Sequence, residues 1–501
     1  MTLSKLLEGI SVTKLFQTVF GQMVVTQEIE VRRIQHDSRK VEQGDAFVAI
    51  RGAEVDGHKF IDDAVHRGAK VVVLEDDKAL PDSFFMHAGV VKIVVQDARK
   101  ALAKMSANYF ENPAGKLQLI GVTGTNGKTT TSYLISSIIE KAGLIGTIEY
   151  KIGDKLIPAT HTTPESLALN ELLARMVENG CKAAVMEVSS HALHQHRVNG
   201  LEFDAAVFTN LTQDHLDYHG TMDQYFRAKK TLFDSLRGSA VAVTNIDDAY
   251  GLRVTESCKA RTISYGVHPH ADVRAEDIKL STAGTRFRIV HQGEATEVES
   301  PLIGRFNVYN IIAAFSTGLA LGISRERLQT GIARFQSVRG RFERVVSPNG
   351  WTVIIDYAHT PDALENCMKA IHDIFDSGDS SPGKRGRIIT VFGCGGNRDR
   401  GKRPLMGRIA TERGDITIVT SDNPRIEDPE RIISEVMMGV LPDAPVYREA
   451  DRGKAIERAL QLAQPGDVVL IAGKGHETYQ VVGREQLPFN DREVVEKFIR
   501  S

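Results

Sequence analysis

The run GTNGKTT, residues 124–130, is the part of this sequence whose residue types and spacing point most directly to chemistry. It lies between an apolar run, Leu117–Val122, and a segment with a helical pattern, Thr129–Lys141. In a strand–loop–helix of this kind, glycines let backbone N–H groups surround phosphate oxygens, and the helix N-terminus favours negative charge. Lys128 would neutralise the β- and γ-phosphates, and the Thr129 hydroxyl would hold Mg²⁺. The residues expected around the phosphates are Gly124, Thr125, Asn126, Gly127, Lys128, Thr129 and Thr130.

Two further groups of polar side chains also follow apolar runs. Glu187 lies near the end of the run Ala183–Val188, where a carboxylate could reach Mg²⁺ opposite the phosphate loop. His215 and Asp217 lie in TNLTQDHLDYHG, again just after an apolar run. Mg²⁺ takes oxygen ligands and usually keeps waters, so one carboxylate with substrate phosphates is sufficient. The alternatives are a helix-capping role for Glu187 and a chance accumulation of histidines around His215.

Seven polar clusters share one position in the pattern, directly after an apolar run that predicts a strand. They are TGTNGKTTT, EVSSH, TNLTQDH, DYAHTPD, GCGGNRD, SDNPR and GKGHE. Open α/β sheets bind ligands outside the carboxyl ends of their strands. Loops are polar in any protein, but seven such clusters in two consecutive blocks predict two sheet edges that face one cleft.

The elements that must position these clusters follow an alternation of apolar strands and helical patterns, which predicts an α/β fold in three domains. The predicted strands are Ala46–Ile50, Lys70–Leu74, Val90–Val95, Leu117–Val122, Ala183–Val188, Ala205–Thr209, Ala240–Thr244, Thr352–Asp356, Arg387–Phe392, Ile416–Thr420 and Asp467–Ala472. A helical segment, Ala98–Phe110, and the breaker Asn112-Pro113 close the first block. The sequence pattern changes again near Val338–Arg344, where a third series of alternating strands and helices begins. The polar stretch Asp376–Arg387 is expected to be an exposed loop.

These boundaries predict domains over residues 1–112, 113–339 and 340–501. The central domain is expected to be a mostly parallel sheet of the P-loop type and the third a Rossmann-like αβ domain. The 501 residues carry 62 Lys and Arg against 64 Asp and Glu, a formal net charge of -2, which argues against a nucleic-acid partner. The four cysteines have no CxxC spacing, which favours reduced thiols in a cytoplasmic protein. Neither a signal peptide nor a membrane span is expected.

Long motifs spread over all three blocks resemble the Mur ligase family. They are HDSRKVEQGDAFVAIRG, GTNGKTTT, HTTPE, MEVSSHALHQHRV, NLTQDHLDYHG, GRFNVYN, GRFE, DYAHTPDAL, GCGGNRDRGKRPLM, SDNPRIEDP and AGKGHETYQ. In this family's nucleotide loop, as here, the general G-x-x-x-x-G-K-[ST] pattern is not met, because Val122 stands at its first glycine. The resemblance implies an ATP-dependent ligase that forms an amide bond through an acyl phosphate. It favours the members that add meso-2,6-diaminopimelate to UDP-N-acetylmuramoyl-L-alanyl-D-glutamate in peptidoglycan precursor synthesis.

The resemblance also implies residues for the UDP-linked substrate. Ser38 and the turn Ala53–Val55 would contact the uridine nucleotide. The diphosphate, sugar and peptide would be bound by Thr162, Thr163, Ser189, Gln195 and Arg197. Hydroxyl and guanidinium groups suit a diphosphate because they donate hydrogen bonds to its oxygens. His161 stands where many family members have asparagine, so its role stays open.

Around ATP, the resemblance adds Asn307, Asn310, Arg341 and Asp356 to the phosphate loop. Arg341 would stabilise charge on the transferred phosphoryl group, and His359 is placed similarly, with an ordinary structural role as the alternative. The implied cofactor is Mg²⁺, with two ions expected. Their ligands would come from Thr129, Glu187, His215 and, if it is carbamylated, Lys229.

The incoming amino acid is implied by Asp422, Asn423, Pro424 and Arg425, a DNPR motif that the family associates with diaminopimelate. Arg425 supplies a planar bidentate donor for a carboxylate. Lysine lacks the distal carboxylate of diaminopimelate, so a buried Arg425 left unpaired against lysine would be costly. Arg398, Gly473 and Glu477 match the rest of this pocket, with Glu477 suited to the distal ammonium. The alternative for the motif is turn chemistry with a solvated arginine.

The reaction hypothesis has two steps. With ATP held by Lys128, Arg341 and Mg²⁺, the D-glutamyl γ-carboxylate attacks the γ-phosphoryl group. The diaminopimelate amine then attacks the acyl phosphate, and phosphate leaves from a tetrahedral intermediate. His215 is a candidate base for the amine proton, and closure of the C-terminal domain would exclude water.

Other hypotheses stay open at this point. Within the ligases, lysine could replace diaminopimelate, and a folylpolyglutamate-synthetase-like enzyme would leave the first block and DNPR without a use. A P-loop switch or motor ATPase would leave HTTPE and GKGHE unexplained. A nucleotide-sugar binding module would make Lys128 and Glu187 dispensable. We expect a monomer.

Overall fold

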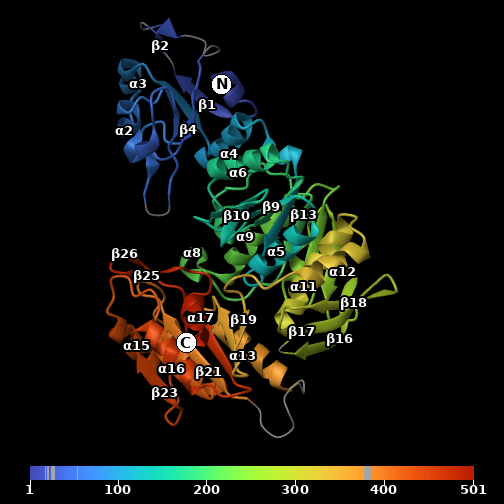
Figure 1. Ribbon diagram of the computed structural model, residues 1–501. Helices are drawn as coiled ribbons and strands as arrows, with labels where there is room; N and C mark the ends of the chain where they lie inside the picture. Colours follow the sequence, from blue (N-terminus) through green and yellow to red (C-terminus); the bar gives the residue numbers. More distant parts are fainter. Residues whose placement is uncertain are drawn as a thin grey trace.

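The computed structural model describes residues 1–16, 18–19, 22–23, 29–52, 55–281, 283–376 and 386–500. They form three α/β domains in chain order, with the central domain between the other two (Figure 1). Two sequence-based predictions extend beyond the described residues. Part of the expected uridine-contacting turn, residues 53–54, and most of the expected exposed loop, residues 377–385, lie outside them.

The N-terminal domain is built on a five-stranded sheet in which β1 is antiparallel to β7 and the other neighbours are parallel. In spatial order its strands are β1 (Val12–Phe16), β7 (Val91–Val95), β6 (Val71–Leu74), β5 (Ala46–Val48) and β4 (Ile34–Gln35). Its helices are α1 (Leu3–Leu6), η1 (Ser38–Lys40), η2 (Gly57–Phe60), α2 (Ile61–His66), α3 (Asp82–Ala88) and α4 (Ala98–Tyr109). A two-stranded ribbon joins β2 (Thr18–Val19) to β3 (Gln22–Met23).

The central domain contains an eleven-stranded sheet whose middle strands are parallel. In spatial order the strands are β11 (Lys155–Pro158), β10 (Glu149–Ile152), β9 (Ala142–Ile145), β12 (Ala183–Glu187), β8 (Gln118–Thr123), β13 (Ala205–Phe208), β14 (Val241–Asn245), β15 (Arg261–Gly266), β16 (Val273–Ser281), β17 (Gly284–His291) and β18 (Glu294–Ser300). Its helices are η3 (Pro113–Lys116), α5 (Lys128–Ile138), α6 (Ser166–Glu178), α7 (Ser190–His194), α8 (Leu216–His219), α9 (Met222–Asp234), α10 (Gly251–Val254), α11 (Arg305–Ala320) and α12 (Arg325–Arg334).

The C-terminal domain has a six-stranded sheet that is parallel except for β19. In spatial order its strands are β19 (Glu343–Val346), β20 (Thr352–Asp356), β24 (Val468–Ala472), β21 (Ile388–Cys394), β22 (Ile416–Ser421) and β23 (Val446–Glu449). The helices are α13 (Pro361–Asp376), α14 (Lys402–Arg413), α15 (Pro429–Met437), α16 (Arg452–Leu462) and α17 (Asp491–Arg500). A hairpin of β25 (Tyr479–Val482) and β26 (Glu485–Pro488) lies outside the sheet.

The central parallel strands of the three domain sheets are buried on both faces, which explains why they are continuous apolar runs rather than alternating ones. In the central sheet, Leu119 belongs to one apolar cluster, whereas Ile120 and Val122 belong to the cluster on the other face. The other two sheets also divide their buried side chains between two clusters. This packing fixes the strands and therefore the loops at their carboxyl ends.

The structure corrects two features of the sequence prediction. The helix expected over Thr129–Lys141 begins one residue earlier and ends at Ile138, because the chain turns at Lys141, whose φ is 53°, and enters β9. The sheet also continues into the antiparallel pairs β9/β10/β11 and β16/β17/β18, which were not predicted. Strands such as β18 are not continuous apolar runs, because much of their surface is exposed, and so the sequence pattern did not reveal them.

None of the helices in the described ranges combines the length and apolar character that crossing a membrane would require.

Candidate active site

The phosphate loop lies between β8 and α5, as the sequence predicted. Gly124 and Gly127 have φ values of 151° and 82°, a region that residues with a Cβ rarely adopt. A Cβ on Gly124 would lie 1.9 Å from Oγ1 of Thr209, and one on Gly127 would lie 2.4 Å from Oδ1 of Asn310. Both glycines are therefore required by backbone geometry and by the closeness of their neighbours. Val122, in contrast, is fully buried in the strand.

The loop is held in place by the segment that follows β13. The backbone N–H of Asn126 donates to Oδ1 of Asn210 (2.9 Å), and Oγ1 of Thr209 donates to the carbonyl of Asn126 (2.6 Å). The Lys128 ammonium donates to the carbonyls of Gly124 and Thr125 at 3.0 and 2.7 Å. Burial lowers the pKa of Lys128. The loop is thus a preformed cradle with a lysine folded over it.

Glu187 ends β12 beside the phosphate loop and is fully buried. Its Oε2 accepts hydrogen bonds from Oγ1 of Thr129 and Oγ1 of Thr147, both at 3.0 Å, and its Oε1 accepts one from the backbone N–H of Thr147 (2.8 Å). A carboxylate and a hydroxyl in contact form a hard oxygen donor set of the kind that Mg²⁺ prefers. Sequence reasoning missed Thr147 because β9, which precedes it, was not among the predicted strands.

Lys229 lies on α9 with 1% of its surface exposed. Its Nζ donates to the carbonyl of Gly124 (2.7 Å) and lies 4.5 Å from the centre of the Tyr225 ring. Burial, together with the nearby charge of Lys128, places the pKa of Lys229 well below the usual lysine value. The amine is therefore disposed to be neutral, which is the form that reacts with CO₂.

His215 precedes α8 in a left-handed conformation, with a φ of 52°. Its ring lies 4.8 Å from that of His191 and its Nε2 lies 3.4 Å from Oδ2 of Asp214. Burial lowers the pKa of His215, and the charges of Lys128 and Lys229 lower it further. The structure therefore brings His215 near both lysines, whereas Thr129 and Glu187 form a separate pair. Asp217 follows in the first turn of α8.

Five residues expected to bind the UDP-linked substrate lie at the carboxyl end of β12 or next to it. The Thr163 hydroxyl donates to the carbonyl of Glu187 (2.7 Å) and accepts from the N–H of Ser189 (3.1 Å). Arg197 donates to the carbonyl of Thr163 and to Oε1 of Gln195, both at 2.8 Å. The Thr162 hydroxyl lies 3.1 Å from that of Thr147, which places this group next to the Glu187 carboxylate.

Ser38 lies in the N-terminal domain and is buried at η1. One link from this domain to the central one is made by Glu165, whose Oε2 lies 3.1 Å from Arg99 of α4 and 3.6 Å from Arg197. The charge of the same carboxylate raises the pKa of His36, two residues before Ser38, but burial outweighs it and lowers that pKa overall. Sequence reasoning missed Glu165, although it belongs to the HTTPE motif. His161 is exposed, and its N–H donates to the Tyr150 hydroxyl (3.1 Å).

Asn307 and Asn310 lie on α11, behind the phosphate loop, and both are buried. Nδ2 of Asn310 donates to Oδ1 of Asn307 (2.9 Å), and Oδ1 of Asn310 accepts from Oγ1 of Thr131 (3.2 Å). These amides support the loop through α5. Thr130, in the first turn of α5, is also buried.

Arg341 projects from the segment that connects the central and C-terminal domains. Its guanidinium lies 4.9 Å from the centre of the Tyr357 ring and close enough to Lys128 to lower that lysine's pKa. Burial raises the pKa of Asp356, at the end of β20, against the opposing influence of Arg341. His359 follows and its Nδ1 lies 2.8 Å from the carbonyl of Tyr357. The structure therefore places Arg341 between the two sheet edges.

The residues expected to bind the incoming amino acid converge at the carboxyl ends of β22 and β24. Nδ2 of Asn423 donates to Oε2 of Glu477 (2.8 Å), and a Cβ on Gly473 would lie 2.5 Å from Oδ2 of Asp422. Sequence reasoning missed Lys474, which is fully buried and donates to Oδ1 of Asn423 (3.0 Å) and Oε2 of Glu477 (2.8 Å). The GKGHE motif contained it, but only the contacts show its role.

Arg425 adopts a left-handed backbone with a φ of 54° and donates from Nη1 to the carbonyl of Gly396 (2.7 Å). Burial lowers the pKa of Arg425, and the nearby charge of Arg398 lowers it further. Arg398 is exposed and contacts the carbonyl of Asn397. Pro424 precedes Arg425, and its carbonyl faces Gly396. Two guanidinium groups this close to each other favour an anionic ligand.

The two sheet edges meet at Asp362, in the first turn of α13. Its Oδ2 accepts hydrogen bonds from Nδ2 of Asn126 (3.0 Å) and from Oγ1 of Thr212 (3.1 Å). Sequence reasoning noted the DYAHTPD motif but gave no role to Asp362. Its contacts place the C-terminal domain directly against the phosphate loop.

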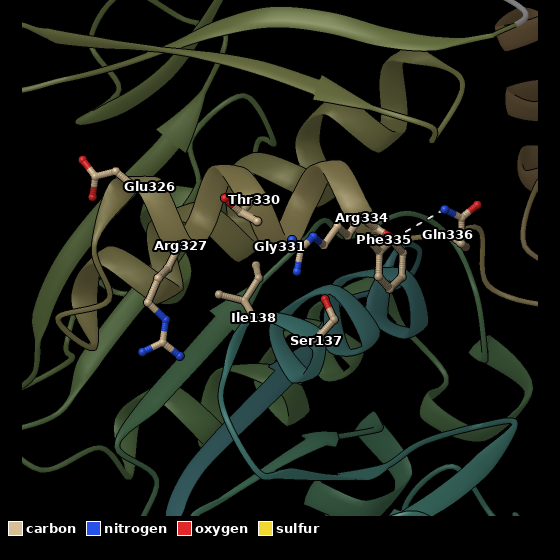
Figure 2. Close-up of a pocket in the computed structure, with 9 residues that line it drawn as sticks. All are labelled: Ser137, Ile138, Glu326, Arg327, Thr330, Gly331, Arg334, Phe335 and Gln336. Atoms are coloured by element: carbon tan, nitrogen blue, oxygen red, sulfur yellow. Dashed lines mark hydrogen bonds between the residues drawn. The ribbon is translucent and has the colours of Figure 1, made fainter.

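A separate open cavity of about 560 Å³ lies between the end of α5 and α12. Ser137 and Ile138 line one side, with Thr330 and Arg334 of α12 opposite (Figure 2). None of the predicted site residues lines this cavity, so it does not belong to the candidate site.

Comparison with known proteins matches three family models to the three domains. The model described as "Mur ligase family, catalytic domain" matches residues 30–110, "Mur ligase middle domain" matches residues 122–318, and "Mur ligase, glutamate ligase domain" matches residues 340–475. The chain is 46% identical to UDP-N-acetylmuramoyl-L-alanyl-D-glutamate–2,6-diaminopimelate ligase from Geobacter sulfurreducens, and the match covers 94% of this chain and 95% of the relative. A relative of the same name from Clostridium tetani is 43% identical over 95% of this chain and 96% of its own length.

Solved structures agree with these matches. A structure of UDP-N-acetylmuramoyl-L-alanyl-D-glutamate–2,6-diaminopimelate ligase superposes with a TM-score of 0.69 at 32% identity, covering 100% of this chain and 99% of that one. MurF from Thermotoga maritima, solved with ADP, shares the fold with a TM-score of 0.62 at 22% identity over 95% of this chain and 98% of its own. The predicted three-domain α/β fold is confirmed. This chain belongs to the Mur ligase family.

Proposed function

We propose that this chain catalyses the ATP-dependent addition of meso-2,6-diaminopimelate to UDP-N-acetylmuramoyl-L-alanyl-D-glutamate, as an acid–amino-acid ligase of peptidoglycan precursor synthesis. Relatives at 43–46% identity carry the name of this ligase. The observation that carries the choice of acceptor is that Arg425 donates to the carbonyl of Gly396, in the loop that carries Arg398, and lies close to Asn423 and Glu477. Two guanidiniums suit the distal carboxylate of diaminopimelate, and a carboxylate nearby suits its ammonium.

The domains divide this work between them. We assign residues 1–112 to the uridine nucleotide, residues 113–339 to ATP and to the peptide end of the UDP-linked substrate, and residues 340–501 to the amino acid. The contacts of Glu165 and Asp362 support this division, because they join the outer domains to the central one at the carboxyl edges of the sheets. We propose that a single chain is the active unit, since residues for all three substrates lie in one chain.

ATP binding is assigned to the phosphate loop with Asn307, Asn310, Arg341 and Asp356. The loop's backbone N–H groups would receive the phosphates at the N-terminus of α5. Lys128 belongs to the loop, and Arg341 lies close enough to it to lower the pKa of Lys128, which supports a common anionic ligand for the two cations. Such fixed charges stabilise a phosphoryl group in transfer because they need no reorganisation during the reaction.

Mg²⁺ fits the oxygen donors beside the loop. The Thr129 hydroxyl and the buried Glu187 carboxylate would hold one ion. A second ion would involve His215 and Lys229, the latter as its carbamate. When bound, the ions supply charge neutralisation of the phosphates. The buried, deprotonation-prone amine of Lys229 supports carbamylation, since only the neutral amine reacts with CO₂.

The chain's own residues would then guide two steps. Thr162, Thr163 and Arg197 would orient the UDP-linked substrate so that its D-glutamyl γ-carboxylate attacks the γ-phosphoryl group of ATP, which forms the acyl phosphate and releases ADP. Arg425 and Glu477 would hold the far end of diaminopimelate so that its other amine reaches the acyl phosphate. His215 would accept the amine proton, because burial lowers the pKa of its imidazole and so favours the neutral form that can take up a proton. Contacts such as Asp362 with Asn126 would keep water out during transfer.

The main alternative is the same ligase reaction with L-lysine. Lysine would leave Arg425 and Arg398 without a carboxylate partner, at the cost of an unpaired, partly buried charge. A folylpolyglutamate-synthetase-like activity would leave the N-terminal domain without a function. ATP hydrolysis without an acceptor gives no use to the Asn423, Lys474 and Glu477 network.

One experiment separates these possibilities. The purified protein is incubated with ATP, Mg²⁺ and the UDP-linked dipeptide, and diaminopimelate or lysine is offered separately while phosphate release and product mass are followed. We expect product and phosphate in equal amounts only with diaminopimelate. Phosphate release without an amino acid would contradict a ligase, and a preference for lysine would contradict the role of Arg425.

A further inference from the structure

A buried arginine lies directly behind the proposed amino-acid pocket. Arg403, near the start of α14, is fully buried. Its Nη1 and Nη2 donate to Oε2 and Oε1 of Glu427, both at 3.0 Å. Nη1 also donates to Oε2 of Glu435 (2.6 Å) and Nη2 to the carbonyl of Gly395 (3.1 Å). Bidentate arginine–carboxylate pairs combine strength with fixed geometry. Arg403 therefore joins α14, α15, Glu427 and the loop that follows β21.

Glu427 carries this link to the two loops that bear the proposed carboxylate-binding arginines. It lies two residues after Arg425, and its Oε1 accepts from the backbone N–H of Asn397, one residue before Arg398. The hydrogen bond from Arg403 is the main reason that the pKa of Glu427 is about 2, so this carboxylate is ionised at neutral pH. Arg403 and Glu427 thus contact both the 395–398 loop, which carries Arg398, and the end of the 422–425 loop, which carries Arg425.

The two loops are in backbone contact above this pair. The N–H of Gly396 donates to the carbonyl of Asn423 (2.9 Å), and the N–H of Ile426 donates to Oδ1 of Asn397 (3.3 Å). A Cβ on Gly396 would lie only 1.9 Å from the carbonyl oxygen of Pro424. The spacing of the loops is therefore set at the level of the main chain.

The backbone at Arg425 and at Asn397, the residue before Arg398, needs such support. Asn397 and Arg425 have φ values of 53° and 54°, in the left-handed region that residues other than glycine rarely adopt. Strained conformations of this kind persist only where surrounding contacts determine them. In addition, Arg398 and Arg425 are like charges close enough to repel each other, which would separate the loops without a restraint.

We propose that Arg403 and Glu427 are positioning residues for acceptor specificity, which hold the 395–398 loop against the 422–425 loop so that Arg398 and Arg425 meet one distal carboxylate. This inference rests on the proposed function and deepens it. The acceptor class it predicts is an amino acid with a second carboxylate at its far end. Neither residue contacts that ligand; each acts through the arginine of the neighbouring loop.

Arg403→Lys and Glu427→Gln test the proposal. Lysine keeps the charge of Arg403 but lacks the planar guanidinium that donates two parallel hydrogen bonds. Glutamine keeps the shape of Glu427 but lacks its charge. We expect the KM for diaminopimelate to rise about 10- to 100-fold in each, from lost charge-assisted hydrogen bonds to the carboxylate. KM for ATP and for the UDP-linked dipeptide, and kcat at saturating diaminopimelate, should change by less than about 3-fold. The preference for diaminopimelate over lysine should fall in parallel.

Matched controls separate positioning from general stability. Arg408→Lys changes an exposed arginine on the same helix, paired with Glu412, and should leave every KM unchanged. In the Arg425→Lys background, Arg403→Lys should add little to the KM for diaminopimelate, since the group it positions is already lost. Thermal melting shows whether each variant is folded. Glu427→Gln, which preserves volume, provides the test if Arg403→Lys does not fold.

The outcomes are distinct. Equal losses for all three substrates, or additive effects with Arg425→Lys, would overturn the positioning role in favour of a purely structural one. An unchanged KM for diaminopimelate in folded variants would also overturn it. If the wild-type protein does not use diaminopimelate at all, the proposed function fails, and this inference fails with it.

Discussion

Oδ2 of Asp362 lies 3.0 Å from Nδ2 of Asn126, although 236 residues separate them in the sequence. The same oxygen accepts from Oγ1 of Thr212 (3.1 Å), whose N–H in turn donates to Oγ1 of Thr125 in the phosphate loop (3.1 Å). Asp362 belongs to the first turn of α13, in the C-terminal domain. The phosphate loop is therefore in direct contact with the domain that we propose to carry the amino acid.

Replacing Asp362 with alanine should weaken the coupling between this domain and ATP. The change removes two hydrogen bonds to neutral partners, each worth about 0.5–1.5 kcal/mol, so kcat/KM for ATP should fall about 10-fold. Steady-state kinetics with varied ATP measure this. Asp373→Ala, on an exposed position of the same helix, is the control and should behave as wild type. An Asp362→Ala enzyme with unchanged kcat/KM for ATP would contradict the coupling.

Gly127→Ala should abolish tight ATP binding. The new Cβ would lie 2.4 Å from Oδ1 of Asn310, at a φ of 82°, so the loop must move away from α11. Calorimetric titration with ATP should show an affinity lowered by more than about 10-fold, because the change combines backbone strain with a clash. Gly180→Ala isolates the strain, since its φ is 75° but no atom lies within 4 Å of its Cβ position. Equal ATP affinity in the two variants would show that the clash is relieved without cost.

Lys229→Ala should lose nearly all activity and recover part of it when a small carboxylate such as acetate is added. The reason is that the buried amine would act as its carbamate, whose carboxylate group acetate can replace in the cavity left by the side chain. The measurement is kcat with and without acetate. The matched control is its neighbour Lys230, paired with Asp234, whose replacement by alanine should have little effect. Full activity of Lys229→Ala without acetate would exclude a catalytic role for the carbamate.

Arg425→Lys should lose discrimination between diaminopimelate and lysine. A lysine side chain supplies one point charge where the guanidinium supplies a planar fork, so the KM for diaminopimelate should rise about 10- to 100-fold. Competition between the two amino acids, followed by product mass, gives the ratio directly. Arg448→Lys, at a half-exposed position on β23 and paired with Glu430, is the control. Retained preference for diaminopimelate in Arg425→Lys would assign specificity elsewhere.

His476 should make the fold sensitive to acid. Burial, then the charges of Arg341, Arg339 and Lys474, lower the pKa of His476 to about 3, against about 6.5 when unfolded. The unfolded state therefore binds the proton more readily, so this contribution to stability is complete above about pH 6.5 and is lost as the pH falls toward about 3.

His476→Gln should remove this dependence. Its melting temperature should fall less than that of the wild type between about pH 7 and about pH 4. Differential scanning calorimetry at several pH values measures the slope. His66→Gln provides the comparison, because the His66 side chain is 75% exposed. The same slope in His476→Gln and wild type would show that other groups cause the acid sensitivity.

Local chemistry accounts for what could be predicted from the sequence. The Gly124–Thr129 loop is a continuous segment whose glycines, lysine and threonine act through the backbone that carries them, so its place between a strand and a helix was evident. The parallel strands were recognisable because burial on both faces makes them continuous apolar runs. Glu187, Asn423 and Arg425 became candidates because they follow such strands, at the sheet edge where α/β proteins bind ligands. The roles proposed for them came from resemblance and stay predictions.

Contacts between distant segments could not be predicted in this way. Asp362 and Asn126, Thr147 and Glu187, and Arg403 and Glu427 are separated by 236, 40 and 24 residues, and nothing in their local sequence specifies the partner. Their geometry depends on the order of the strands in the sheets and on how the domains meet, which are collective results of packing. The sequence by itself therefore determined which chemical groups stand at the ends of the strands, whereas only the tertiary structure decided which of them touch, because hydrogen bonds and ion pairs require atoms within about 3 Å whatever their separation along the chain.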